Sequence, residues 1–344
     1  MIKKQNYLKH AIVLFLLLLL MQPERAWAAY ENVEFSSLTN HDGLTNSQVG
    51  AILKDTRGYI WFGTQSGLCR FDGFRMKTFY YINTDDKSLP NNSVDELQQD
   101  YGGNIWVHTS VGYCIYKYDE EQFERKPEEW LKNIHVQGPP YKLLIDKDKN
   151  MWIAVYGQGL YYHNAKTKNT YLFKFTKKAQ PGCLKEGNIS KITEVDGDAL
   201  ITYGDGTICR VNGQKQKVLW YNSFLANHKA AGDNGAYTFY DGIGGFWVSV
   251  SNANYVYQSK TGKWTDARSY LTNMGIDIPC PTRILMRDIA RDKAGNLWVA
   301  SDHNGLFFVD FKRKICRQYV HSEAKGSIVD NSLQKVYVDE EGAI

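Results

Sequence analysis

The sequence predicts an all-β protein built from repeated four-stranded units, and three observations support this. Tyrosine and tryptophan are abundant, with 23 and 9 copies in 344 residues, and aromatic side chains suit the half-buried surface of a sheet. A short pattern recurs, and its anchor residue returns every 45 to 51 residues, at Trp61, Trp106, Trp152, Leu200, Trp247 and Trp298. Four strands can be traced around the anchor. This number of strands at this period is typical of β-propeller blades.

The first part of each repeat predicts a hairpin. An apolar strand, 49–54 in the first repeat, runs into a turn with an acid six residues before the anchor and usually a glycine three residues before it. The acid can accept a backbone N–H, and the glycine supplies a positive φ angle. The acids are Asp55, Asp100, Asp146, Glu194, Asp241 and Asp292, and the turn position holds Gly58, Gly103, Lys149, Gly197, Gly244 and Gly295.

The second part of each repeat predicts three further strands. The second strand carries the anchor, a short loop follows, and the third strand brings an aromatic residue ten positions past most anchors. A fourth strand is predicted at 76–81, 168–175 and 315–320. We name these strands A to D, from the innermost strand of a blade to the outermost.

The two ends of the chain suggest an unfinished ring. Residues 332–344 align with the start of a repeat, with Asp339 at the acid position and Gly342 at the glycine position, so a tryptophan is expected after Ile344. We therefore expect about six and a half of seven blades, in a fragment of a longer protein. Residues 32–39 are expected to be a strand that would complete the last blade of a closed seven-bladed ring. With strands B and C of that blade missing here, the apolar face of the sixth blade is expected to lie largely uncovered.

The first 28 residues have the composition of an export signal. A basic start, an apolar run at 11–21 and the small residues Ala26 and Ala28 predict cleavage before Ala29. An uncleaved membrane anchor is the alternative. Removal of this segment lowers the net charge from +4 to +1, so the remaining propeller, 29–344, has no basic field for nucleic acid or an anionic membrane.

No local motif predicts catalysis, a metal or a cofactor. The acids at the turns recur in every repeat, which indicates a role in the repeat rather than in a reaction. The eight histidines lack metal-ligand spacing. The six cysteines of an exported chain could form disulfides, but Cys69 and Cys114 occupy the same place in successive repeats and are interpreted as small buried side chains.

The candidate binding residues come from the loops that make successive blades differ. In a propeller the B-to-C loops and D-to-A connections open on one face, and aromatic rings with amide, hydroxyl and carboxylate groups suit a sugar. The candidates are Tyr156, Gln158, Asn254, Asp302, His303 and Asn304 in B-to-C loops, and Trp130, Trp264 and Tyr270 in connections. The connection 264–270 and the loop 302–304 are favoured, because the longest anchor spacing lies there.

Residues 35–73, with the run D-x-x-G-x-I-W-F-G-T-x-x-G-L-x-R-F-D at 55–72, resemble the opening of the two-component-regulator propeller of hybrid two-component sensor histidine kinases. The resemblance implies a periplasmic part of two seven-bladed propellers and a β-sandwich. It also implies an intact parent that is homodimeric, is anchored in the inner membrane and responds to oligosaccharides. The kinase and DNA-binding parts have no counterpart in these 344 residues, and Leu200 and Lys149 depart from the pattern.

Two functions therefore remain open at this point. The first is a ligand-sensing periplasmic domain that takes an oligosaccharide and carries no catalytic residue of its own. The second is a periplasmic propeller enzyme acting on polysaccharide. Such an enzyme needs two acids near the central channel, outside the repeated turn positions, and the sequence identifies no such pair.

Overall fold

The computed structural model describes residues 33–177, 183–227, 236–250, 253–279 and 284–344. These fall into two compact units. One contains 38–320 and 330–344, and the described part of the other contains 33–37 and 321–329. The expected export signal lies outside the described residues. Among the residues that are described, no helix is long and apolar enough to cross a membrane.

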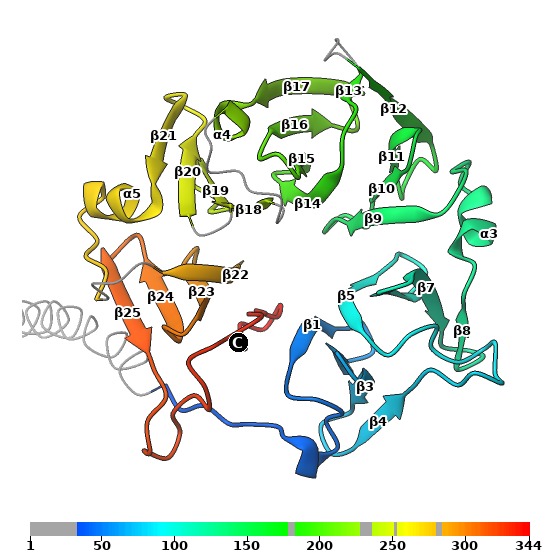
Figure 1. The fold of residues 1–344 in the computed structure, drawn as a ribbon, viewed down its shortest axis with the longest axis horizontal. Coiled ribbons are helices and arrows are strands. Elements are labelled where there is room, and N and C mark those ends of the chain that lie inside the picture. Colours follow the sequence, from blue (N-terminus) through cyan, green and yellow to red (C-terminus); the bar gives the residue numbers. More distant parts are fainter. Residues whose placement is uncertain (1–32, 178–182, 228–235, 251–252, 280–283) are drawn as a thin grey trace, which may run out of the picture. The chain divides into compact units, whose positions relative to one another are not determined.

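The larger unit holds six sheets whose strands follow one another in chain order, arranged as a ring of blades (Figure 1). The first blade consists of β1 (Val49–Lys54), β2 (Ile60–Thr64), β3 (Gly67–Phe71) and β4 (Met76–Phe79). The second consists of β5 (Val94–Gln99), β6 (Ile105–Thr109), β7 (Gly112–Lys117) and β8 (Gln122–Glu124). The third consists of β9 (Pro140–Ile145), β10 (Met151–Val155), β11 (Gly159–His163) and β12 (Thr170–Thr176), with a short parallel strand β13 (Leu184–Lys185) outside it.

The remaining three blades follow the same plan. The fourth consists of β14 (Ile189–Val195), β15 (Asp198–Tyr203), β16 (Ile208–Asn212) and β17 (Lys217–Asn222). The fifth consists of β18 (Ala236–Tyr240), β19 (Gly245–Val250), β20 (Ala253–Gln258) and β21 (Lys263–Asp266). The sixth consists of β22 (Leu285–Arg291), β23 (Leu297–Asp302), β24 (Leu306–Asp310) and β25 (Ile315–Tyr319).

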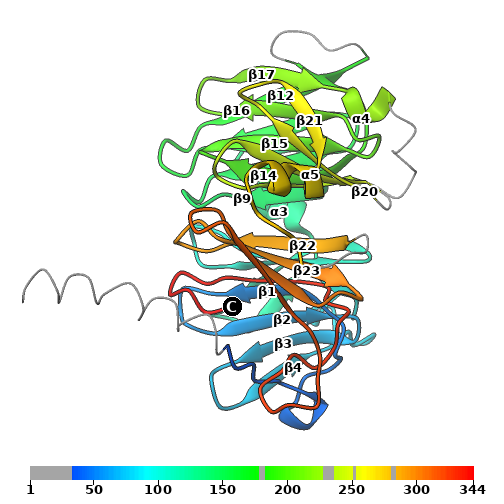
Figure 2. The same ribbon diagram turned by 90° about the vertical axis from the view of Figure 1, so that its left-hand side faces the viewer.

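The predicted all-β propeller of four-stranded blades is thus confirmed. In side view, β1 to β4 lie in order from the middle of the ring outward (Figure 2). In the part of the chain that the structure describes, helices occur in connections between blades and in one turn before the first blade. They are α3 (Pro127–Lys132), α4 (Phe224–Asn227), α5 (Ala267–Asn273) and the 3-10 turn η1 (Asn40–Asp42).

The core consists of apolar layers between neighbouring blades. The anchor side chains of the first five blades face the next blade: Trp61 lies edge-on to Tyr116 at 5.2 Å, in a layer that also contains Phe79 and Ile105. Corresponding layers join blades two and three, three and four, four and five, and five and six. Burial of these aromatic and branched side chains supplies the main stabilisation of the ring.

The repeated acid has a structural role in five blades. One carboxylate oxygen of Asp55 accepts backbone N–H groups from Arg57 and Tyr59, and the other accepts the indole N–H of Trp61. The same indole bond joins Asp100 to Trp106, Asp146 to Trp152, Asp241 to Trp247 and Asp292 to Trp298, at 3.1 to 3.3 Å. Acid and anchor therefore form one unit that fixes the turn to the core, as expected for repeat architecture.

The fourth blade departs from this unit in a concerted way. With Leu200 as anchor there is no indole to bind, and the Glu194 carboxylate instead accepts the backbone N–H of Lys147. The hairpin is closed by Asp196 and Gly197, both with positive φ, as a two-residue turn requires. In the third blade Lys149 takes the glycine position with φ +64, which shows that a lysine can occupy this left-handed turn.

Residues 330–343 repeat the start of a blade, although no strand is assigned there. Asp339 accepts backbone N–H groups from Glu341 and Ala343, and Gly342 has φ +92, which is the geometry of the turn at Asp55 and Gly58. This segment lies between β22 and β1 (Figure 1), and Lys54 binds Asp339 at 2.9 Å. The predicted turn positions are thus correct, and the described residues contain six complete blades.

Two expectations about the ends are wrong. Residues 33–39 form no strand; in the smaller unit Phe35 N–H donates to the Gly326 carbonyl at 2.8 Å, and no ladder is assigned to these residues. The apolar face of the sixth blade is not uncovered either. Its residues Trp298, Ala300, Leu306 and Phe308 are all at most 4% exposed. Residues 331–333 run along this edge, with backbone bonds from Gly305 to Asn331 and from Leu333 to Ser301.

The cysteines behave as small apolar side chains where they are described. Cys69 and Cys114 are fully buried at equivalent places in β3 and β7, opposite Phe62 and Val107, as predicted. Together with Cys183, Cys209 and Cys316 they are free thiols, and Cys280 lies outside the described residues. Burial raises the pKa of the Cys114 thiol, so it stays protonated and unreactive near neutral pH.

Candidate functional site

One position of strand A carries a charged side chain in four of the six blades. In each blade one residue of strand A pairs with the anchor, as Gln98 pairs with Trp106. The charged position lies two residues before that residue. In blade order this position holds Ala51, Glu96, Lys142, Lys191, Tyr237 and Asp288, and the corresponding residue of the segment 330–343 is Lys335. All of these except Tyr237 line a central cavity of about 270 Å³, which we call the channel.

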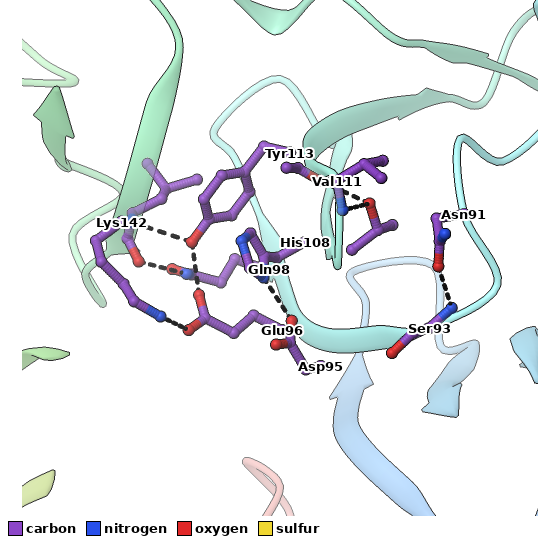
Figure 3. Close-up of polar contacts among 12 residues, drawn as sticks. Asn91, Ser93, Asp95, Glu96, Gln98, His108, Val111, Tyr113 and Lys142 are labelled. Carbon is purple, nitrogen blue, oxygen red and sulfur yellow. Dashed lines mark hydrogen bonds and ion pairs between the residues drawn. The ribbon is translucent and has the colours of Figure 1, made fainter. Parts of the chain in front are cut away.

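The channel side chains of the second and third blades form a closed network (Figure 3). Glu96 binds the Lys142 ammonium at 2.8 Å and accepts the Tyr113 hydroxyl at 2.6 Å. The same hydroxyl accepts the backbone N–H of Leu143 at 3.1 Å. The Gln98 amide donates to the Leu143 carbonyl and accepts the backbone N–H of Ile145. Burial, followed by the nearby Glu96 charge, raises the pKa of Tyr113 well above its usual range, so the hydroxyl remains a donor. The network fixes β5 beside β9.

A second pair in the second blade lies beside this network. His108 Nδ1 is 2.5 Å from Asp95 Oδ1, and the imidazole ring lies 4.5 Å from the Tyr113 ring. Burial alone would raise the pKa of Asp95, but the hydrogen bond with His108 and the charges of His108 and Lys142 outweigh it and lower the pKa. The carboxylate of Asp95 is therefore held in its charged form.

This lowered pKa gives a pH-dependent contribution to stability. A carboxylate whose folded-state pKa lies below its unfolded value stabilises the fold above the unfolded pKa, about 3.9 for aspartate, and loses that contribution as pH falls through the folded pKa. Because Asp95 is half exposed, we expect less than about 1 kcal/mol. Urea unfolding at several acidic pH values should show a smaller loss of stability below about pH 4 for Asp95→Asn than for the parent.

Asp148 supplies the matched control, since it is an exposed carboxylate in a turn. Asp148→Asn should follow the parent profile. Equal profiles for the parent and Asp95→Asn would show that the pair with His108 contributes nothing.

The other charges of the channel come from the fourth and sixth blades and from residues 330–343. Asp288 accepts the backbone N–H of Val336 at 3.3 Å and lies 3.5 Å from the Lys335 ammonium. Lys191 is different: its backbone pairs with β15, but within the described residues its ammonium forms no hydrogen bond or ion pair. Burial lowers the pKa of Lys191, and the charges of Lys335 and Lys142 add to this effect, against Asp288 and Glu96.

Of the predicted binding residues, Tyr156 and Gln158 lie in the loop after β10, in the third blade. Tyr156 is 69% exposed, and its ring stacks on that of Tyr141, with centroids 3.9 Å apart and planes 17° apart. Gln158 binds the Gln137 carbonyl and the Tyr161 hydroxyl. Tyr141 directly precedes Lys142 in β9 but packs against the layer between blades three and four, so Tyr156 is the exposed ring of the pair.

Four further predicted residues hold loops of blades five and six. Asp302 binds both Arg287 and its neighbour His303, and the His303 ring is exposed and also meets Ser332 at 3.2 Å. Asn304 accepts from Gln318 through its carbonyl, and Asn254 donates to the Ile284 carbonyl at 2.6 Å. Asn254 also lines a cavity of about 390 Å³ between blades five and six.

Three predicted aromatic residues serve packing instead of an open loop. Tyr270 is 3% exposed and its hydroxyl donates to the turn acid Asp241 at 2.8 Å, so it does not reach the surface. Trp264 belongs to strand β21 and donates its indole N–H to Asn222. Trp130 in α3 lies edge-on to the anchor Trp106 at 5.3 Å. Of the three, only Tyr270 is buried, and the predicted contact of the connection 264–270 with a saccharide stays a prediction.

Sequence reasoning missed the charged channel. A signal was present, since one column of the aligned repeats carries charged residues at the same place in strand A, at Glu96, Lys142, Lys191 and Asp288. No pair of acids near the channel was identified from the sequence, whereas the structure places Asp95, Glu96 and Asp288 in its lining. Each of these carboxylates is already bound, to His108, Lys142 and Lys335 respectively.

The comparisons with known proteins agree with this architecture. A family model described as "Two component regulator propeller" matches residues 43–66, which confirms the resemblance indicated by the run at 55–72. No curated protein matches the sequence.

Among solved structures, the chain is similar to extracellular domains of signalling systems of B. thetaiotaomicron. For a hybrid two-component system the identity is 20% and the TM-score 0.64, over 90% of this chain and 40% of that one. For a one-component system the values are 16% and 0.58, over 91% and 41%. A catalytically inactive virginiamycin B lyase from Staphylococcus aureus, with quinupristin, gives 14% and 0.51, over 84% and 88%. These likenesses show the propeller fold, and the chain spans about two fifths of the extracellular domains it resembles.

Proposed function

We propose that this chain is the ligand-sensing propeller of a two-component signalling sensor, that it acts in the periplasm, and that it responds to oligosaccharides. The observation that carries the proposal is the match of residues 43–66 to the two-component-regulator propeller. The similarity in fold to extracellular domains of two signalling systems supports it. In this proposal the chain has no catalytic role. Ligand binding alters its packing against the rest of a homodimeric parent.

The most suitable surface for a sugar is the stacked pair Tyr141 and Tyr156. A sugar ring presents C–H groups that pack on an aromatic face, and hydroxyls that pair with amides and carboxylates. Tyr156 offers an open face whose orientation is already fixed by Tyr141, so little side-chain entropy is lost on binding. Gln158 and the channel side chains supply polar groups nearby.

A glycan array probed with the purified protein, followed by calorimetry with the glycan it retains, tests the proposal. Tyr156→Ala should weaken binding by about tenfold or more, because a stacked aromatic contact and its buried area are lost. Tyr101→Ala is the matched control: Tyr101 is likewise exposed, at 48%, but lies in the turn at the opposite end of the strands. Retention of no glycan, or equal affinity of both variants, would contradict the proposal.

The alternative of a polysaccharide-cleaving enzyme can be judged in the same experiment. Asp95, Glu96 and Asp288 share the channel, but each is held by a cationic partner or a histidine. The sensor proposal predicts that a retained glycan is recovered intact after prolonged incubation. Release of new reducing ends would favour the enzyme instead.

A further inference from the structure

We propose that Lys191 is an anion-binding residue of the channel, which takes the carboxylate or sulfate group of an acidic saccharide. This inference rests on the proposed function for the identity of the ligand, but the anion site itself does not. It is carried by the cavity, by the pairing of every other charge that lines it and by the unpaired ammonium.

The pairing in the channel is complete except at one residue. Glu96 is bound by Lys142 and Tyr113, and Asp95 by His108. Asp288 is bound by Lys335 and by a backbone N–H. Among the described residues, only Lys191 of the charged groups that line the channel lacks such a partner.

An unpaired ammonium in such a place is costly. Lys191 is half-buried in β14, and burial lowers its pKa, which means that the protein destabilises the charged form. The charged groups that act on it are Lys142, Glu96, Asp288 and Lys335, and the two lysines repel it. Tyr237 and Arg287 line a smaller cavity together with Lys191. A bound anion would remove this penalty, and a neutral sugar would not.

The position of Lys191 also suits an acidic saccharide. β9 and β14 are the inner strands of adjacent blades (Figure 1). The Tyr141 hydroxyl lies beside the Ile189 backbone, two residues before Lys191. The aromatic pair and the ammonium thus both lie where the inner strands of the third and fourth blades meet. A sugar ring can stack there while its acidic group enters the channel.

The linkage to pH follows from the direction of the pKa shift. Only the protonated amine pairs with an anion, so binding raises the pKa of Lys191 toward its ordinary value and is accompanied by proton uptake where the free amine is partly neutral. Affinity for an anion should therefore fall as pH rises through the lowered pKa of Lys191.

Trace acetylation of the intact protein, read by mass spectrometry, tests the site without knowledge of the glycan. Sodium sulfate and sodium glucuronate, each compared with sodium chloride at equal ionic strength, should protect Lys191 from acetylation, and neutral glucose should not. Lys215, an exposed lysine in a turn, is the internal control and should react alike in all solutions. Unchanged labelling of Lys191 in both anions would overturn the proposal.

The variants separate this inference from the proposed function. Lys191→Gln should bind an acidic glycan about tenfold or more weakly, with Lys215→Gln as the matched change of charge, and circular dichroism should show both folded. If a retained acidic glycan binds Lys191→Gln as tightly as the parent, the anion site is wrong and the sensor proposal stands. If no glycan is retained but sulfate protects Lys191, the anion site stands and the oligosaccharide proposal fails.

Discussion

Replacement of Trp106 by alanine is expected to destabilise the protein by about 3–5 kcal/mol, the usual cost of truncating a large buried aromatic residue. Trp106 is fully buried between the second and third blades. Its indole N–H satisfies the buried Asp100 carboxylate at 3.1 Å, and its ring contacts Trp130. Alanine would leave both a cavity and a carboxylate with one bond fewer. Denaturant unfolding followed by tryptophan fluorescence measures the change.

A Trp106→Leu variant indicates how the cost divides between the cavity and the lost hydrogen bond to Asp100. The fourth blade shows that leucine can occupy the anchor position when the turn beneath it is rebuilt, as at Leu200. We expect Trp106→Leu to lose less stability than the alanine variant but still more than 1 kcal/mol, because the Asp100 turn is unchanged. A loss below about 1 kcal/mol for Trp106→Ala would show that the anchors do not hold the blades together.

Replacement of Glu96 by alanine is expected to cost about 1–3 kcal/mol. It removes the partner of the Lys142 ammonium and of the buried Tyr113 hydroxyl at once, and polar groups left without partners carry a penalty of this size. The cost is lower than for a fully buried ion pair, because Glu96 and Lys142 are 31% and 23% exposed. Glu96→Gln keeps a hydrogen-bond acceptor and should cost less. The free energy of unfolding in urea tests both.

Glu129 supplies the control for this prediction. It forms a lysine pair of the same 2.8 Å length with Lys132, but on an exposed helix surface. Glu129→Ala should change stability much less than Glu96→Ala, because an exposed ion pair is screened by water. Equal effects of the Glu96 and Glu129 variants would mean that the channel network is no stronger than a surface pair.

The fold could be predicted from the sequence because each blade repeats one local solution. Acid, glycine and anchor recur at fixed spacing since one carboxylate must reach both the turn and the indole, as Asp146 does with Asn150 and Trp152. The indole bond itself was not foreseen, because it depends on side-chain direction rather than on spacing. The missing strand at 33–39 shows the limit of pattern matching, since β-like residues there lack a neighbouring ladder.

The site was predictable only in part for a related physical reason. Loop position indicated Tyr156 correctly as an exposed aromatic residue. It failed for Tyr270, because a connection can turn inward and bury its ring against a turn acid. The channel depends on which strand-A side chains meet around the ring axis. Such contacts join Glu96 with Lys142 and Asp288 with Lys335, residues far apart in the sequence.

The central claim is that a saccharide binds at the corner formed by the Tyr141–Tyr156 pair and Lys191. Hydrogen–deuterium exchange with and without the glycan selected on the array tests it most directly. The account predicts slower exchange at 138–143, 155–159 and 189–192, with the turns at 100–104 and 146–150 unchanged. Protection confined to 253–254 and 302–304, or no protection at any of these segments while the glycan is bound, would contradict it.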